Sequence, residues 1–259
     1  MKPLSLTLLM AGLTGMAAHA SPREDTDFLV PHMAVGTHIS TVFSIASSIK
    51  AEGFDELVRR NSGSSDNMLT QVSADQALTF EAKVNYDGTP LQQAQNVLSD
   101  GGARSCWNSD CQPYTDASGL LYNRLLWGAP PARLKAGMTW RVTIPKAWEL
   151  GPAGTQTVTV MHVDRTDGSA TLRREGTASG MFAGEPAQVA LVKNGQKVTF
   201  DVTPGQAHWI GVTTFRHGLI VNDELIVTRA DVLQSKETGS VAATRRRYIL
   251  LNAAPFPTL

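Results

Sequence analysis

The chain has 259 residues, 42% of them hydrophobic, and its 23 basic and 23 acidic residues give no net charge at neutral pH. A neutral chain lacks the excess of Lys and Arg that binds nucleic acid or an anionic membrane surface, so we expect neither partner. The length is sufficient for one large domain, or two smaller ones, that bury a core without metal ions.

The first twenty residues have the pattern of a secretory signal peptide. Lys2 is followed by an uncharged run, and the small-residue triplet Ala-His-Ala at 18–20 matches a signal-peptidase site before Ser21. The run is shorter than the roughly 20 apolar residues of a transmembrane helix, and glycines interrupt it. We therefore predict a signal peptide at 1–20. The mature chain, 21–259, is expected to be a soluble periplasmic or secreted protein with no membrane-spanning segment.

Alternation of apolar and polar residues is the main pattern after the leader. Apolar side chains recur at every second position in 80–86, 138–144 and 198–202, which places one face of each segment against a core. Residues 35–49 are ambiguous between helix and strand, but their Thr, Ile and Val content favours a strand. Arg246–Leu251 is interpreted as the last strand.

Turn dipeptides between apolar segments predict hairpins, because both residues of such a turn must accept positive φ. Strands joined by short turns predict an all-β fold, namely an antiparallel sandwich, barrel or half-barrel. The three dipeptides are Asn194-Gly195 between 188–193 and 196–202, Asp167-Gly168 between 156–164 and 170–174, and His217-Gly218 between 209–216 and 219–228.

Helical signals are few, and we expect one or two short helices. Residues 91–98 follow Pro90 and have apolar side chains three to four positions apart, which predicts a short helix lying across the sheet.

Residues 101–135 differ from the rest of the chain, because they combine Gly-Gly and Pro-Pro pairs with four aromatic residues. We expect a single β-rich domain over 21–259. The alternative is two β subdomains, 21–100 and 136–259, joined by this segment. Long ordered loops with aromatic content are often functional. The candidate binding residues are Trp107, Asn108, Asp110, Tyr114, Tyr122 and Trp127.

The two cysteines of the chain, Cys106 and Cys111, lie within this segment. A close pair in an exported protein predicts a disulfide, which here would hold a turn and present Trp107. A zinc site would need further ligands, and a redox pair typically has the spacing Cys-x-x-Cys.

Arginines occur in three short clusters, at 59–60, 173–174 and 245–247. Because the chain as a whole is neutral, we interpret each cluster as arginines on the solvent-facing side of a strand.

No sequence motif points to catalysis, a cofactor or a metal. The histidines lack the spacing of a metal site, and His208 and His217 merely flank a predicted strand. We therefore expect a non-enzymatic protein of the cell envelope that binds an apolar small molecule or a partner protein. One alternative is an exported hydrolase acting on cell-wall or extracellular polymer, with acids or a histidine–acid pair drawn from separate strands. The other is a structural component that adds an edge strand to an assembly.

Overall fold

The computed structural model describes residues 28–29, 33–74, 77–90, 94–99, 102–107, 110–114, 122, 124–131, 133–148, 153–182 and 184–255. These residues form one short helix, α1 (Arg124–Trp127), and a 14-stranded antiparallel sheet, which confirms the all-β prediction. The strands are β1 (His38–Ala51), β2 (Leu57–Val72), β3 (Leu78–Tyr86), β4 (Thr89–Pro90), β5 (Ala94–Ser99), β6 (Gly102–Trp107), β7 (Asp110–Tyr114), β8 (Thr139–Ile144), β9 (Gly154–Asp164), β10 (Ser169–Ser179), β11 (Gln188–Lys193), β12 (Gln196–Arg216), β13 (Leu219–Ser235) and β14 (Gly239–Pro255).

The sheet consists of two meanders joined by the first and last strands. Its order is β7-β6-β5-β3-β2-β1-β14-β13-β12-β10-β9-β8, with β4 beside β3 and β11 beside β12. The two meanders, β1 to β7 and β8 to β14, meet where β1 pairs with β14 over 13 residue pairs. Residues on both sides of the 101–135 segment therefore belong to one continuous sheet.

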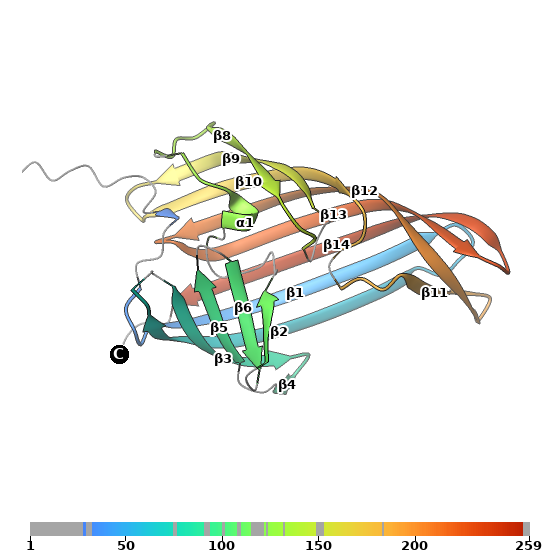
Figure 1. Ribbon diagram of the computed structural model, residues 1–259, viewed down its shortest axis with the longest axis horizontal. Coiled ribbons are helices and arrows are strands. Elements are labelled where there is room, and N and C mark those ends of the chain that lie inside the picture. Colours follow the sequence, from blue (N-terminus) through green and yellow to red (C-terminus); the bar gives the residue numbers. More distant parts are fainter. Residues whose placement is uncertain are drawn as a thin grey trace, which may run out of the picture.

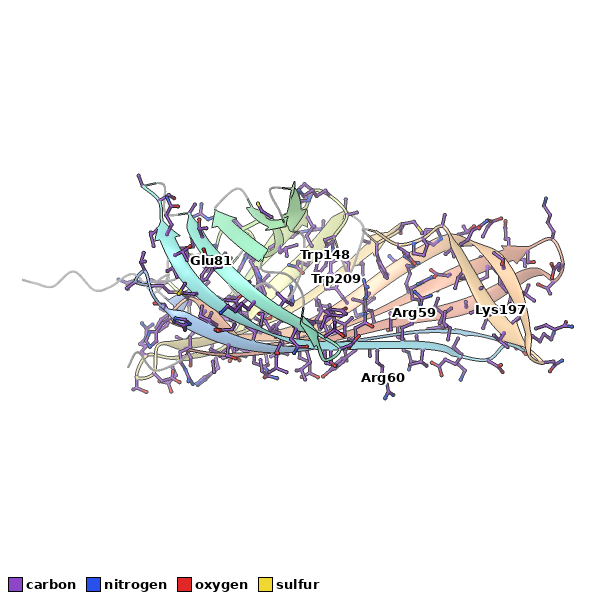
Figure 2. The ribbon with its side chains drawn as sticks, turned by 90° about the horizontal axis from the view of Figure 1, so that it is seen from below. Arg59, Arg60, Glu81, Trp148, Lys197 and Trp209 are labelled. Atoms are coloured by element: carbon purple, nitrogen blue, oxygen red, sulfur yellow. The ribbon has the colours of Figure 1, made fainter. Side chains whose placement is uncertain are left out.

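The sheet is strongly curved and open, and it forms a trough (Figure 1). In Figure 1 and Figure 2, β1, β13 and β14 make the floor, whereas β3, β5 and β6 rise along one side. Strands β8 to β10 and helix α1 lie along the other side. Because successive side chains of a strand point to opposite faces, each strand supplies residues to the concave and the convex face in turn.

The main hydrophobic core lies on the concave face under α1 and the β8–β9 strands. It is built around aromatic rings, with Trp148 packed edge-on against Trp209 at 5.5 Å between ring centroids. Trp127 of α1 packs in the same way on Phe215 of β12, at 5.3 Å. Aliphatic residues from β8, β9, β10, β13 and β14 complete this core, so α1 is fixed against the sheet by burial of its own side chains.

A second core closes the far end of the trough. β12 has a bulge between Pro204 and Ala207, where it leaves β10 and continues beside β11. A Cβ on Gly205 would lie 2.1 Å from the carbonyl oxygen of Ala230, so this close approach requires glycine. The β11–β12 hairpin packs on β1 and β14, and Phe54 meets Phe200 edge-on at 5.1 Å.

Local sequence signals located the hairpins correctly. β11 ends at Lys193 and β12 begins at Gln196, and Asn194 has the predicted positive φ of 53°. Residues 38–49 of the predicted 35–49 strand lie in β1, as the β-branched residues predicted, whereas β14 extends well beyond the predicted 246–251.

The predicted helix over 91–98 is wrong, because residues 94–99 form β5. β5 is paired on both sides, with β3 and with β6. Helices of fewer than about 12 residues are marginal on their own, so two hydrogen-bonded ladders outweigh a weak periodic pattern.

The position of Trp209 depends on the glycine opposite it. Gly176 faces Trp209 across the β10–β12 ladder, and a Cβ at position 176 would lie 2.3 Å from Cζ2 of the indole ring. We expect Gly176→Ala to displace the ring, disturb its 2.9 Å Nε1 hydrogen bond to Gln156, and lower the free energy of unfolding by about 1–3 kcal/mol. Urea denaturation measures this change. Thr177→Ala, at the neighbouring exposed position, is the control, and equal midpoints for both variants would contradict the packing.

Candidate binding site on the concave face

Residues that lie directly opposite one another on neighbouring strands form rows that run across the floor of the trough. Arg59 of β2 is opposite Ser47 of β1, which is opposite Arg247 of β14. Val227 of β13 is the next member of this row and is buried in the main core. Because directly opposed residues of an antiparallel pair share a face, the row Arg59–Ser47–Arg247 lies on the concave side. Figure 2 shows Arg59 inside the trough and Arg60, the next residue, on the opposite side of the sheet.

The adjacent row also crosses β2, β1, β14 and β13, but it begins with two apolar residues and ends with two arginines. It runs from Leu57 of β2 through Ile49 of β1 to Arg245 of β14 and Arg229 of β13. Leu57 and Ile49 belong to the second hydrophobic core. The floor therefore changes from apolar at β1 and β2 to cationic at β14 and β13.

A cavity of about 300 Å³ lies over these two rows. Its other wall is β11 and the described part of the connection from β10 to β11, residues 180–182 and 184–187; this connection is here called the strap. This volume is at the lower end of the range for small-molecule pockets, roughly 300–1,000 Å³, so it fits a small molecule or one end of a longer one. The lining residues are Ser47, Ile49, Leu57, Arg59, Phe182, Gly184, Glu185, Pro186, Gln188, Val189, Ala190, Arg245, Arg246 and Arg247.

A buried ion network holds the strap against the floor. Arg229 donates to both carboxylate oxygens of Glu185, at 2.7 and 2.8 Å, and to the carbonyl oxygen of Gly180 at 3.0 Å. Its guanidinium also bonds both oxygens of Asp231 and lies 4.3 Å from the Phe182 ring centroid. Because these partners come from the strap and from β13, the network determines how far the strap lies from the sheet.

The network keeps Arg229 charged although its side chain is fully buried. Burial alone lowers the pKa of this guanidinium, but hydrogen bonds and charges from Asp231 and Glu185 outweigh burial and raise it. Arg245 adds a second cation, with Nε 3.1 Å from Asp231 and a terminal nitrogen 3.0 Å from Glu185. Two arginines and two carboxylates therefore share the site, and its charges balance.

A second buried ion pair lies under α1. Arg174 and Asp223 are both fully buried, with two contacts of 2.7 and 3.0 Å between them. Thr213 also donates to Asp223, and the Arg174 guanidinium lies 4.6 Å from the ring centroid of Trp127. The prediction that the arginine clusters face solvent is therefore wrong for Arg174. Period-two alternation sends one residue of each pair outward and the other inward.

Two of the candidate binding residues, Tyr122 and Trp127, lie in and around the core. Trp127 is 1% exposed. The Tyr122 hydroxyl donates toward the carbonyl oxygens of Trp127 and Gly128, at 3.0 and 2.9 Å, and burial raises its pKa. Trp140 Nε1 donates to the same Trp127 carbonyl at 2.7 Å. The main contacts of this pair therefore fasten the end of α1 to the sheet.

The other candidates lie on the β6–β7 hairpin at one end of the sheet. Trp107 and Asp110 are opposite one another at the start of the β6–β7 ladder, and Tyr114 is opposite Ala103 at its other end. Asn108 lies outside the described residues. The binding role of these four residues stays a prediction.

His208 and His217, the two histidines considered in the sequence analysis, do not line the cavity. His208 Nε2 is 3.3 Å from Glu175 Oε1, but the two side chains are 51% and 46% exposed and alternate with buried residues, so they lie on the convex face. His217 is exposed in the β12–β13 turn, with a φ of 49°. Within the described part of the chain, no three His, Cys, Asp or Glu side chains are grouped as metal ligands.

Comparisons with known proteins give no family. No protein-family model and no curated protein matches the chain. A lipovitellin structure is similar over 88% of this chain at 11% identity, with a TM-score of 0.46, and the chain spans 26% of that one. OmpT, an outer membrane protein of Vibrio cholerae, matches 87% of this chain and 99% of its own at 10% identity and a TM-score of 0.24. A DUF1329 family protein from Desulfovibrio piger matches 83% of each chain at 9% identity and a TM-score of 0.15. At these scores the likenesses carry no functional argument.

Among the described residues, none of the helices has the length and apolar character to cross a membrane.

The β6–β7 register supports a test of the predicted disulfide. Cys106 and Cys111 are directly opposite one another, and opposed residues of an antiparallel pair have Cα atoms about 4.5–5.5 Å apart, within disulfide range. We expect intact-mass measurement before and after reduction to show one Cys106–Cys111 bond. Because the loop is short, its loss should cost less than the roughly 3 kcal/mol of a 15-residue loop. Two free thiols in exported protein would disprove the bond.

The Arg229 network gives a stability prediction. Arg229→Met removes the cation between Glu185 and Asp231 and leaves their carboxylates under-compensated inside the protein, which should cost about 3–5 kcal/mol of unfolding free energy. Arg60→Met, at an exposed position on the convex face of β2, is the control and should change stability by about 0.5 kcal/mol or less. Chemical denaturation compares the two, and hydrogen exchange should show faster exchange in the strap of the Arg229 variant. A fully stable Arg229→Met protein would show that the network does not hold the strap.

Proposed function

We propose that this protein is an exported, non-enzymatic binding protein of the cell envelope, and that it holds an apolar or amphiphilic small molecule in the trough. The observation that supports this most strongly is the cavity on the concave face. It has an apolar wall formed by Leu57, Ile49 and Val189, and a strap fixed by buried ion pairs. A concave site with an apolar lining and a few converging polar groups is typical of small-molecule binding.

Pre-organisation supports the same function. The strap is held by Arg229, Glu185 and Asp231 before any ligand arrives. A wall that is already ordered loses little conformational entropy when a ligand binds, so more of the apolar contact contributes to affinity. The proposed export rests on the leader pattern at residues 1–20.

The alternative function, hydrolysis of an envelope polymer, has less support. It requires a nucleophile or acid beside a base within a cleft. The described histidine–carboxylate pairs, His208–Glu175 and His38–Asp66, have exposed side chains and do not line the cavity. The cavity lining contains one carboxylate, Glu185, which is already bonded to Arg229. We therefore favour binding over catalysis.

A neutral fluorescent probe tests the proposal. We expect N-phenyl-1-naphthylamine to bind the wild-type protein with enhanced fluorescence, because it is apolar and carries no charge. Ser47→Trp places a large ring in the cavity and should abolish or strongly weaken binding. Ser48→Trp, the next residue, places the same ring on the convex face and should leave binding unchanged.

Circular dichroism and thermal unfolding would establish that both tryptophan variants are folded. The proposal fails if the wild-type protein does not bind the probe. It also fails if folded Ser47→Trp binds the probe as well as wild type does, because the cavity would then not be the site.

A further inference from the structure

The cavity lining carries more positive than negative charge. It includes four arginines and one carboxylate, Glu185. Glu185 is already engaged by Arg229 and Arg245, which also share Asp231. Arg246 alternates to the convex face with its cross-strand neighbours, so Arg59 is the lining cation on the concave face that adds to the balanced network of Arg229, Arg245, Glu185 and Asp231. The inner surface at the cavity therefore has a net positive charge.

Arg59 differs from the other concave-face arginines in its exposure. Arg174 and Arg229 are fully buried and each is matched by an aspartate, Asp223 and Asp231 respectively. Arg59 is exposed and lines the cavity. Among the described residues, no carboxylate lies within ion-pair distance of its guanidinium. Its opposite neighbour on β1 is the hydroxyl residue Ser47, and both lie on the concave side (Figure 2).

We infer that the cavity binds the anionic head group of an amphiphile, a carboxylate or a phosphate, with Arg59 as the main cationic contact. This inference rests on the proposed function and names the chemical class of its ligand. Ser47 lies directly opposite Arg59, and its hydroxyl is placed to donate a neutral hydrogen bond to the same head group. The next row, Leu57 and Ile49, supplies apolar surface for the first part of the hydrocarbon chain.

The chemistry of the guanidinium supports an anion over other head groups. Arginine binds carboxylate and phosphate through two parallel hydrogen bonds, which are stronger than those between neutral groups. An anion also offsets the excess positive charge of the cavity, whereas a neutral head group does not and a cationic one adds to it. The surface attracts anions locally although the whole chain is neutral.

A set of single-chain amphiphiles tests the inference. Dodecanoate, dodecyl phosphate, dodecanol and dodecyltrimethylammonium have hydrocarbon chains of similar length and differ in head group. Each is used to displace bound N-phenyl-1-naphthylamine, the ionic amphiphiles below their micelle concentrations and dodecanol below its solubility limit. We expect the two anions to bind the wild-type protein roughly tenfold or more tightly than dodecanol, and the cation to bind most weakly. The comparison between dodecanoate and dodecyl phosphate then distinguishes the two anionic groups.

Matched arginine variants locate the contact. Arg59→Gln should remove most of the anion preference, measured as the ratio of dodecanoate affinity to dodecanol affinity. Arg59→Lys should retain part of the preference, because it retains the charge. Arg60→Gln is the control, since it removes the same charge from the adjacent, exposed residue on the convex face (Figure 2).

The outcomes separate this inference from the proposed function. Equal displacement of the probe by all four amphiphiles would overturn the anion preference and leave apolar binding standing. Full anion preference in Arg59→Gln, or an equal loss in Arg60→Gln, would overturn the assignment to Arg59. Absence of probe binding by the wild-type protein would instead overturn the proposed function itself.

Discussion

The antiparallel pairing of β1 with β14 is the contact on which the candidate site depends. Most other neighbouring strands are close in sequence, whereas this pair joins opposite ends of the described chain through 13 residue pairs. Loop-closure entropy grows only with the logarithm of loop length, so the long separation adds little cost. The pairing places Ser47 and Ile49 directly beside Arg247 and Arg245. Without it, the two halves of the cavity floor would belong to separate sheets.

The charges on the concave face follow from the alternation of the strands. Arg173 and Arg174 are adjacent, yet Arg173 pairs with Glu175 on the surface and Arg174 is fully buried with Asp223. An unpaired charge buried inside a protein is far more costly than a surface charge, so a fully buried arginine needs an acidic partner. Asp223 and Asp231 on β13 supply these partners.

These particulars show what the sequence could predict. Hairpins at Asn194-Gly195 and His217-Gly218 depend on backbone conformations that a few residues determine locally, and they were located to within a residue. The β5 strand was mistaken for a helix because ladder bonds to distant strands outweigh local periodicity. The inward position of Arg59 does not follow from the overall polarity of the Arg59-Arg60 cluster, because the position of each residue along the strand decides which face its side chain occupies. Ser47 and Ile49 determine the face of their β2 neighbours only through the β1–β2 register, and register is a tertiary property.

The concave face carries two kinds of arginine: Arg174 and Arg229, which stabilise the fold, and Arg59, which we propose as a ligand contact. Arg174 and Arg229 are desolvated and matched by carboxylates of the chain, so their charge is used in folding. Arg59 is exposed beside an apolar wall and has kept its access to solvent. A guanidinium in water costs little in stability, yet its charge interacts more strongly with a ligand that enters a partly desolvated cavity. The trough therefore combines a charge-balanced framework under the strap with an exposed cation, Arg59, that is available to the proposed anionic ligand.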